Sequence, residues 1–468
     1  MDPTGDDDND DARVQSNYVL EVDAAQDDRA TAYNLCSFAR PHMRAFYMST
    51  FGFFSAFLAW FSFAPLMPII KQDLNLTKDQ IWTANICSVS STIVARFMIG
   101  PLTDKLGARL SMGVVLIVFA IPVAIGGFVV SNGASLAVMR FIIGVIGCVF
   151  VPCQAWVSSM FAHQIAGVTQ ALAGGWGNLG GGVTQFFMAF VYSLFRTSAN
   201  QEMAWRSSFV VPAIIIFIIG LSIVLFTDDC PKGNYKRLHL SGEKQNVDTK
   251  KAFKEAASIS DSWILFVQYA CCFGVELTMN NLAASYFNEQ FGLEATTAAY
   301  VASSFGGMNL FARALGGKLS DFAYASLKFG HHPLNSRLLV QGVILIYEGL
   351  MIIVFSRCTT FGSALAVMML FSLGVQMSEG ATFALVPFVK QNVVASVSGI
   401  VGAGGNVGAM CWGFIFLFGP ENPQTCLLIL GIIVLASAFI TFFLKFSDAN
   451  KLVQQELTSS KTKEENKE

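Results

Sequence analysis

Two arginines lie in matching patterns on apolar stretches that are roughly two hundred residues apart. Arg96 precedes Asp104 by eight residues with a glycine midway, and Arg313 precedes Asp321 in the same way. On a helix, each aspartate lies about 12 Å along the axis from its arginine and on roughly the same face. If each aspartate marks the cytoplasmic end of a helix crossing the roughly 30 Å apolar core of a bilayer, each arginine lies near mid-depth. An ionisable residue there normally faces a bundle interior or a cavity, where a pair of guanidinium groups could hold an anion.

Composition places the chain among membrane proteins. Apolar residues make up 53% of the 468 residues and charged residues only 13%, whereas a soluble domain carries roughly 25% charged residues. The net charge is −2, and no basic surface of the kind that binds nucleic acid is expected. The ten cysteines show no metal-ligand spacing, so we expect no metal and no cofactor.

Twelve apolar segments are long enough to cross a bilayer, which predicts an all-α integral membrane protein with twelve transmembrane helices. The expected spans lie near 46–70, 81–103, 110–131, 135–160, 164–195, 206–227, 262–288, 297–318, 337–356, 361–389, 393–419 and 424–445.

One long polar break divides these spans into two sets of six. The expected organisation is a disordered acidic cytoplasmic tail at 1–44, an N-terminal six-helix bundle at 45–227, a cytoplasmic linker at 228–261, a C-terminal six-helix bundle at 262–445 and a cytoplasmic tail at 446–468. Lys and Arg are concentrated in the linker and in the loops on its side, which predicts that both termini are cytoplasmic.

A glycine-rich motif also occurs once in each half. Residues 174–182 read GGWGNLGGG and residues 402–409 read GAGGNVGA. Aligning Asn178 with Asn406 also aligns several glycines, and the motifs fall in the fifth span of each half. The arginines fall in the second span of each half, so the chain reads as a duplicated six-span unit. The two six-helix bundles are therefore expected to be related by a pseudo-two-fold axis.

The motif residues have a packing interpretation and a functional one. Glycines spaced in this way allow helices to approach closely, and packing alone would explain them. It does not explain the asparagines, whose amides could reach substrate oxygens or cap exposed backbone. The glycines expected to pack helices and to gate are Gly174, Gly177, Gly181, Gly402, Gly405 and Gly408.

The arginines could pair with carboxylates or helix ends for structural reasons alone. Only Glu276, Glu348 and Glu379 lie well inside the apolar spans, so few acidic partners are available. Two guanidinium groups without matching acids would repel each other unless an anion bound between them. Because guanidinium is planar and forked, it suits a small flat oxyanion.

Several stretches resemble one family of carriers. The Asp104–Gly107 turn, within GPLTDKLGAR, resembles the cytoplasmic loop motif of the major facilitator superfamily. AGGWGNLGGGVTQ and GAGGNVGA resemble the paired signature motifs of its nitrate/nitrite porter family. AFYMSTFGFF, APLMPII, AWRSSF and CFGVEL are similar to the eukaryotic high-affinity nitrate transporters. The resemblance covers residues 35–445.

The resemblance implies an alternating-access carrier and assigns roles to particular residues. Arg96 and Arg313 would clamp the anion, and Asn178 would contact it. The aromatics above and below the anion would be Phe150, Tyr269 and Phe273. Asn406 follows only from the internal repeat. Asp104, Gly107 and Asp321 belong to the cytoplasmic motifs.

The coupling mode rests on one acidic residue. Bacterial relatives that exchange nitrate for nitrite tend to lack an acid near the site, whereas CFGVEL places Glu276 close to it. This position favours proton symport through Glu276, although a structural hydrogen-bonded role is an equal alternative. Glu379 departs from the family pattern, because a small or neutral residue is expected in its glycine-rich turn.

The expected function is high-affinity import of nitrate, and of nitrite, across the cell membrane. The alternatives are a nitrate/nitrite antiporter, a nitrate-sensing receptor, or a carrier of another anion. An enzyme is not expected, because no nucleophile–base pair, metal cluster or phosphate loop can be assembled. The expected partners are nitrate, nitrite, protons and the lipid bilayer, with an accessory membrane protein as a further candidate and no nucleic acid.

Overall fold

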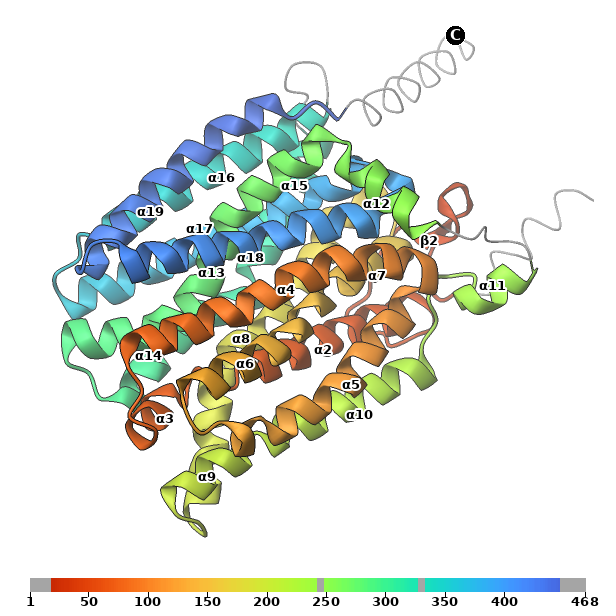
Figure 1. Cartoon of the computed structure of the whole chain (residues 1–468). Coiled ribbons are helices and arrows are strands. Elements are labelled where there is room, and N and C mark those ends of the chain that lie inside the picture. Colours follow the sequence, from red (N-terminus) through yellow and green to blue (C-terminus); the bar gives the residue numbers. More distant parts are fainter. Residues whose placement is uncertain (1–17, 242–247, 327–332, 447–468) are drawn as a thin grey trace, which may run out of the picture.

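The computed structural model describes residues 18–241, 248–326 and 333–446, which form a bundle of long helices (Figure 1). The helices before the linker are α2 (His42–Trp60), α3 (Met67–Asp73), α4 (Lys78–Leu106), α5 (Ala108–Val129), α6 (Gly133–Gly144), α7 (Phe150–Met160), α8 (Ala166–Arg196), α9 (Gln201–Ser208) and α10 (Val210–Phe226). The linker carries α11 (Tyr235–Ser241) and α12 (Thr249–Ala257).

The second half repeats this arrangement. Its helices are α13 (Ser260–Phe291), α14 (Ala295–Gly307), α15 (Ala312–Ser326), α16 (Pro333–Phe355), α17 (Phe361–Leu385), α18 (Val394–Phe418) and α19 (Pro423–Ser437). Short 3₁₀ helices continue or join them: η3 (Val145–Val149), η4 (His163–Ile165), η5 (Met308–Leu310), η7 (Val386–Phe388), η8 (Gln391–Val393) and η9 (Ala438–Phe443).

Each of the twelve predicted spans coincides with a helix or with an interrupted helix, so the predicted all-α class is confirmed. Among the described residues, nine helices are long and apolar enough to cross a membrane by length and composition alone. The helix α8 falls outside this group because its inner surface is made of glycine, glutamine and asparagine rather than large apolar residues. Such small and polar residues are typical of helices that face other helices.

Two spans are interrupted near their middle, one in each half. The fourth span is built from α6, η3 and α7, and the eighth from α14, η5 and α15. In a 3₁₀ segment the backbone bonds shift from the α-helical pattern, which leaves carbonyl groups available to side chains. The Gly147 carbonyl of η3 accepts hydrogen bonds from Arg96, and the Leu310 carbonyl of η5 accepts one from Trp176 at 3.0 Å.

Residues 18–41 differ from the prediction of a disordered tail. They include a short antiparallel pair, β1 (Val22–Asp23) and β2 (Arg29–Ala30), joined by η2 (Ala24–Gln26). The Ala30 carbonyl accepts a hydrogen bond from the Ala162 backbone N–H at 2.9 Å, which attaches the pair to the end of α7. The prediction was wrong for this part because a polar composition does not exclude backbone pairing with a helix end. Residues 1–17 and 447–468 lie outside the described residues.

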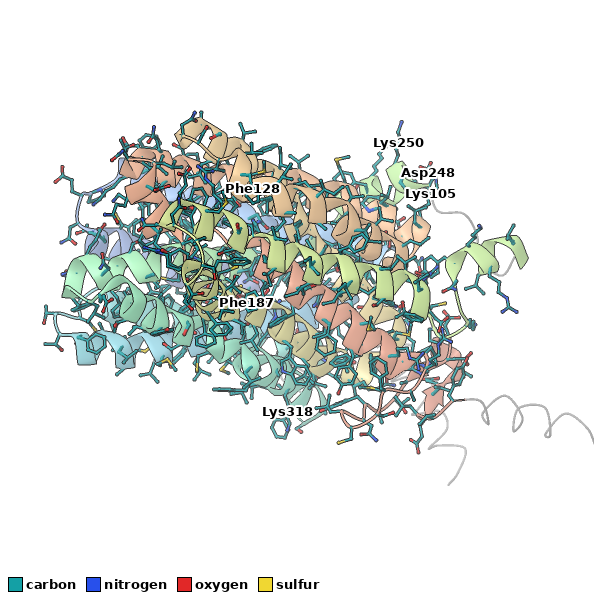
Figure 2. The ribbon with its side chains drawn as sticks, turned by 90° about the horizontal axis from the view of Figure 1, so that it is seen from below. Lys105, Phe128, Phe187, Asp248, Lys250 and Lys318 are labelled. Atoms are coloured by element: carbon teal, nitrogen blue, oxygen red, sulfur yellow. The ribbon has the colours of Figure 1, made fainter. Side chains whose placement is uncertain are left out.

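The two ends of the bundle differ in character from its sides. Figure 2 places Lys105, Asp248 and Lys250 at the end that carries α11 and α12, which we call the linker end. Large apolar side chains such as Ile121 and Phe128 are exposed along the sides of the helices. An exposed apolar surface of this extent is typical of a protein that lies within a lipid bilayer.

Candidate functional site

Arg96 lies on α4 and is completely buried. Its Nε and Nη2 atoms each donate to the Gly147 carbonyl at 3.1 Å, and Nη1 donates to the Gly402 carbonyl on α18. Within the described part of the chain, Arg96 forms no salt bridge. The buried guanidinium is therefore held by backbone carbonyls and by the ring faces of Phe150 and Phe273, and no acid of the described residues pairs with it directly.

Arg313 lies on α15, is equally buried and has different partners. Its Nη1 atom forms an ion pair with Glu379 of α17, and Nη2 donates to the Tyr269 hydroxyl at 2.9 Å. Few acidic partners were expected for the arginines, and Arg313 takes one of the three acids that lie inside the spans. The sequence could not select Glu379 over Glu276 and Glu348 as this partner, because the choice depends on how α17 packs against α15.

The three predicted aromatic residues stack on one another beside the arginines. The rings of Phe150, Tyr269 and Phe273 lie within 20° of parallel, with centroids 5.1–6.0 Å apart. The guanidinium carbon of Arg96 lies 4.9 Å from the Phe150 ring centroid, and that of Arg313 lies 5.6 Å from the same centroid. The structure thus gathers both arginines and all three predicted aromatics around one ring.

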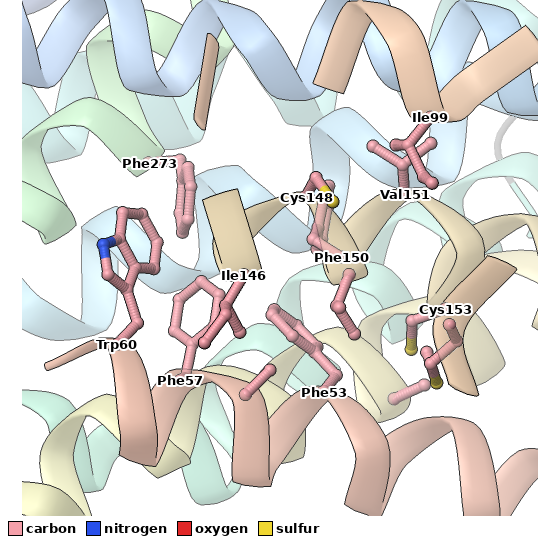
Figure 3. Packing of buried hydrophobic residues seen from close by; sticks show 14 of the residues in the cluster. Phe53, Phe57, Trp60, Ile99, Ile146, Cys148, Phe150, Val151, Cys153 and Phe273 are labelled. Carbon is pink, nitrogen blue, oxygen red and sulfur yellow. The ribbon is translucent and has the colours of Figure 1, made fainter. Parts of the chain in front are cut away.

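Aromatic side chains of α2 complete this cluster. Figure 3 shows Phe53 and Phe57 of α2 pointing toward Phe150 and Phe273. The Phe53 ring lies 5.3 Å from Phe150, and the Phe57 ring lies 6.2 Å from Phe273. All four rings are fully buried, so the cluster forms part of the contact between the two halves.

The glycine motifs and the arginines are paired crosswise between the halves. A methyl group on Gly174 of α8 would lie 2.7 Å from Nε of Arg313, which belongs to the other half. A methyl group on Gly402 of α18 would lie 3.3 Å from Phe150 and 3.4 Å from Nη1 of Arg96. Each motif therefore begins with a glycine that leaves room for the arginine of the opposite half.

The remaining motif glycines do not share one environment. A methyl group would overlap Phe53 at Gly177, Phe273 at Gly405 and the Ala270 carbonyl at Gly408. At Gly181 the nearest atom would be 3.4 Å away, which is an ordinary contact. Close helix approach is thus required at Gly177, Gly405 and Gly408 but not at Gly181.

Asn178 connects two acidic side chains. Its Nδ2 atom donates to Glu276 Oε2 and to Glu379 Oε2, both at 3.1 Å. The other oxygen of Glu276 accepts from Asn309 Nδ2 of η5 at 2.8 Å. All four side chains are buried, and Glu276, the predicted proton carrier, lies next to the arginine cluster as expected.

Asn406 occupies the matching position on α18. It is fully buried, and neither polar atom of its side chain has a hydrogen-bond partner among the described residues. It lies one helical turn beyond Gly402, whose carbonyl accepts a hydrogen bond from Arg96. A buried amide without partners is costly, so this position has unused capacity to hold a polar ligand.

The two motif aspartates join the halves at the linker end. Asp104 Oδ2 accepts from the Ser396 backbone N–H at 3.1 Å and from its hydroxyl at 2.6 Å, at the start of α18. Asp321 Oδ2 accepts from the Val168 backbone N–H at 2.7 Å, at the start of α8, and forms an ion pair with Arg337. A carboxylate at a helix N-terminus satisfies a free donor and interacts favourably with the helix dipole.

Gly107 ends α4 with a backbone φ of +91°, a conformation that favours glycine. A methyl group there would overlap the carboxylate of Asp229, which accepts from the backbone N–H groups of Arg109 at 3.0 Å and Tyr235 at 3.1 Å. The pKa of Asp229 is raised above its ordinary value, because the effect of burial outweighs that of Arg109 and of these N–H groups, which lower it. The turn after α4 is therefore fixed by a glycine and an acid of the linker.

Contacts between the halves also occur at the opposite end. Trp82 of α4 stacks on Phe416 of α18 with ring centroids 5.7 Å apart, and Lys78 forms a 3.4 Å ion pair with Glu289 of α13. At the linker end, a cavity of about 320 Å³ is lined by residues of both halves, including Asp104 and Asn392. The arginine cluster therefore lies between two zones where the halves touch.

The predicted site residues did not include Phe53, Phe57, Phe383 or Asn309, and Glu379 was named in the sequence without being assigned to the site. Phe53 contacts Phe150, while Phe383 lies 4.8 Å from Phe150 and 4.9 Å from Tyr269, edge-on to both rings. Glu379 lies four residues before Phe383. The spacing of Glu379 and Phe383 predicts a shared helix face, and this signal could have placed both residues in the site.

The sequence profile of the Major Facilitator Superfamily matches residues 49–413. The chain is 37% identical to the High affinity nitrate transporter 2.5 of Arabidopsis thaliana over 421 residues, which cover 90% of this chain and 82% of that protein. The chain belongs to the nitrate/nitrite porter family of the major facilitator superfamily. Membership of this family makes it a membrane transporter and not an enzyme, as predicted.

This porter is also similar to a cyanobacterial transporter in sequence and to a solved symporter in fold. A Nitrate/nitrite transporter NrtP of Picosynechococcus is 27% identical over 464 residues, which cover 80% of this chain and 85% of that protein. Among solved structures, the E. coli fucose:proton symporter FucP superimposes with a TM-score of 0.59 at 17% identity, covering 86% of this chain and 99% of that one. The structural likeness shows the fold alone, and it agrees with the twelve-helix prediction.

Proposed function

We propose that this protein imports nitrate, and also nitrite, across the cell membrane by alternating access with proton symport. The linker end faces the cytoplasm, together with both termini. This orientation is supported by the basic residues of the linker and of the loops at that end, including Lys105, Lys250 and Lys254. The named relatives, which are nitrate and nitrate/nitrite transporters, support the choice of substrate.

The observation that carries the proposal is the buried charge of Arg96 beside the second arginine. Arg96 has no carboxylate partner among the described residues, and it shares the Phe150 ring with Arg313 of the other half. A monovalent anion between them would pair directly with the guanidinium of Arg96 and would contact both halves at once. Contact with both halves is what a carrier needs in order to couple binding to their relative movement.

The surrounding side chains favour a small flat anion. Phe150, Tyr269 and Phe273 present nearly parallel ring faces, and Asn406 offers an amide that has no hydrogen-bond partner within the described part of the chain. A planar ion with three oxygens could lie along these faces and accept hydrogen bonds from the guanidinium and amide edges. A tetrahedral dianion such as sulfate would need more donors and a wider space than this cluster supplies.

The contacts at the two ends supply the parts of an alternating-access cycle. The bundles at 45–227 and 262–445 would move as units about the arginine cluster. The Asp104 and Asp321 caps would release when the linker end opens, and the Trp82–Phe416 stack would release when the opposite end opens. Glu276 would carry a proton, because it lies within hydrogen-bond reach of the predicted substrate ligand Asn178.

Nitrate binding to the purified protein tests the substrate assignment. We expect saturable binding of nitrate that nitrite competes with, since both ions are planar and monovalent. Sulfate and phosphate should not compete at the same concentration. Competition by sulfate, or an absence of nitrate binding by folded protein, would contradict the assignment.

A further inference from the structure

One oxygen of Glu379 accepts hydrogen bonds from two of the side chains that would bind nitrate in the proposed site, Arg313 and Asn178. Glu379 Oε2 forms the ion pair with Arg313 Nη1 and also accepts from Asn178 Nδ2 at 3.1 Å. The three side chains are completely buried. The carboxylate of Glu379 therefore sits where an oxyanion bound by Arg313 and Asn178 would sit.

A carboxylate and nitrate compete for such donors because both are flat and monovalent and accept hydrogen bonds through oxygen. From this arrangement, and resting on the proposed nitrate site, we propose that Glu379 is an internal competitor of the substrate. When Glu379 accepts a proton, its bonds to Arg313 and Asn178 break, and nitrate accepts hydrogen bonds from these two side chains instead. When nitrate departs, Glu379 loses the proton and forms the ion pair again.

The charges around Glu379 explain why the exchange requires a proton. The charged and titratable groups that face it are Arg313 from α15, Glu276, Tyr269 and Cys272 from α13, Glu348 from α16, and Arg96 from α4. The two arginines balance Glu276 and Glu379 when both of these acids are ionised. Glu348 is counted as protonated, because it is buried and forms no ion pair among the described residues. Nitrate adds one negative charge, and a proton on Glu379 offsets it. Without that proton, a buried carboxylate would lose its cation, which is strongly unfavourable.

Glu276 differs from Glu379 in its partners. Its oxygens accept from the amides of Asn178 and Asn309, at 3.1 and 2.8 Å, and it forms no ion pair with Arg313. Nitrate on Arg313 would therefore remove the cation from Glu379 and leave the Asn309 bond to Glu276 in place. The step that links substrate binding to proton binding is thus assigned to Glu379, beside the proton carrier proposed at Glu276.

The test measures nitrate affinity of the purified protein by calorimetry between about pH 5 and about pH 8. In the wild type, affinity should fall as the pH rises, approaching about tenfold per pH unit, because binding takes up a proton. In Glu379→Gln, affinity should not vary with pH, since the amide carries no charge and cannot hold the ion pair. Glu348→Gln is the matched control, because it also removes a buried acid but not one paired with Arg313, and it should follow the wild type.

A second measurement uses only the wild-type protein. Nitrate added in weak buffer should raise the pH reported by an indicator dye, with about one proton taken up per nitrate bound. Binding without proton uptake would overturn the role of Glu379, as would a wild-type pH dependence that persists in Glu379→Gln. These results would leave nitrate binding itself intact. A wild-type protein that binds no nitrate at any pH would instead remove the proposed function and this inference together.

Discussion

The two arginines of the site play different parts, although the sequence presents them in the same pattern. Arg96 is held by the carbonyls of Gly147 and Gly402, whereas Arg313 forms an ion pair with Glu379. Arg96 is therefore the arginine that has no directly paired carboxylate among the described residues. In the proposed site, Arg96 can pair with an incoming anion directly, whereas Arg313 must first give up its ion pair with Glu379.

Replacing either arginine by lysine tests the clamp. Arg96→Lys and Arg313→Lys keep the charge but lose the fork that reaches two partners, so nitrate affinity should fall by at least about tenfold, or about 1.4 kcal/mol. Titration calorimetry on purified protein measures this. Arg140→Lys is the matched control, because Arg140 is also buried but contacts Asn281 rather than the aromatic cluster. Near-normal nitrate affinity in either site variant would remove the clamp.

Sequence patterns predicted which residues gather at the site better than how they are paired. The repeat placed Arg96 with Arg313 and Asn178 with Asn406, because duplication is visible in one chain. The Glu379–Arg313 pair could not be predicted, since it depends on the rotation of α17 against α15. Glu379, which departs from the family pattern, proved informative because it pairs with Arg313 of the predicted site.

At the scale of helices, the crosswise packing of α8 and α18 positions the site. Gly174 leaves space for Arg313 and Gly402 leaves space for Arg96, so each arginine abuts the motif helix of the opposite half. Interrupted helices contribute as well, since η3 supplies the Gly147 carbonyl and η5 supplies Asn309. Neither interruption is visible as a break in the apolar pattern, and both went unpredicted for that reason.

Two glycines of one motif give a matched pair of variants. Gly177→Ala would overlap Phe53 and should lower the stability of the protein by about 1–3 kcal/mol, with reduced nitrate transport. Gly181→Ala would make only an ordinary contact at 3.4 Å and should be tolerated. Thermal unfolding in detergent and uptake into vesicles measure the two effects. Equal behaviour of the two variants would show that this face of α8 does not pack as described.

The aspartate caps at the linker end should contribute unequally. Asp104→Ala removes the two hydrogen bonds to Ser396, at a cost of about 0.5–2 kcal/mol. Asp321→Ala removes the cap on Val168 and also breaks the ion pair with the buried Arg337, so its cost should be larger. Denaturation of purified variants compares them. A smaller loss for Asp321→Ala than for Asp104→Ala would contradict the assigned partners.

In the whole molecule, the two halves meet where α4 packs against α18 and where α8 packs against α15. The cluster around Arg96 and Arg313 lies at this contact between the halves. This arrangement follows from the twelve spans and the duplication, both of which the sequence predicted. The ordered segment at 18–41 did not follow, because its attachment to the end of α7 depends on backbone groups that no side-chain pattern reveals. The architecture is that of the major facilitator fold, and the proposed site lies where its two halves meet.

The proposed import of nitrate against the membrane potential requires a coupling ion. A cell interior that is negative by 100 mV opposes nitrate entry by about 2.3 kcal/mol per charge. One proton per nitrate cancels this electrical term, and two reverse it. The site holds two carboxyl groups on the same amide, Glu276 and Glu379, which is enough for two protons. We therefore expect more than one proton per nitrate transported, with one taken up by Glu379 when nitrate binds and another carried by Glu276.

The stoichiometry predicts an electrical signal. Nitrate added outside a voltage-clamped cell that expresses the protein should produce an inward current that grows as the external pH falls. Glu276→Gln should weaken this pH dependence while nitrate binding persists, because Glu276 contacts neither arginine through an ion pair. A current that is independent of pH in the wild type would rule out a proton as the coupling ion.

Labelled nitrate uptake into proteoliposomes with an imposed pH gradient tests the central claim most directly. With the outside acidic, wild-type protein should accumulate nitrate above its external concentration, and collapse of the gradient by a protonophore should stop accumulation. Arg96→Lys in the same vesicles should not accumulate nitrate. If vesicles accumulate nitrate only when preloaded with nitrite and do not respond to the pH gradient, the protein is an exchanger and the proposed symport is wrong.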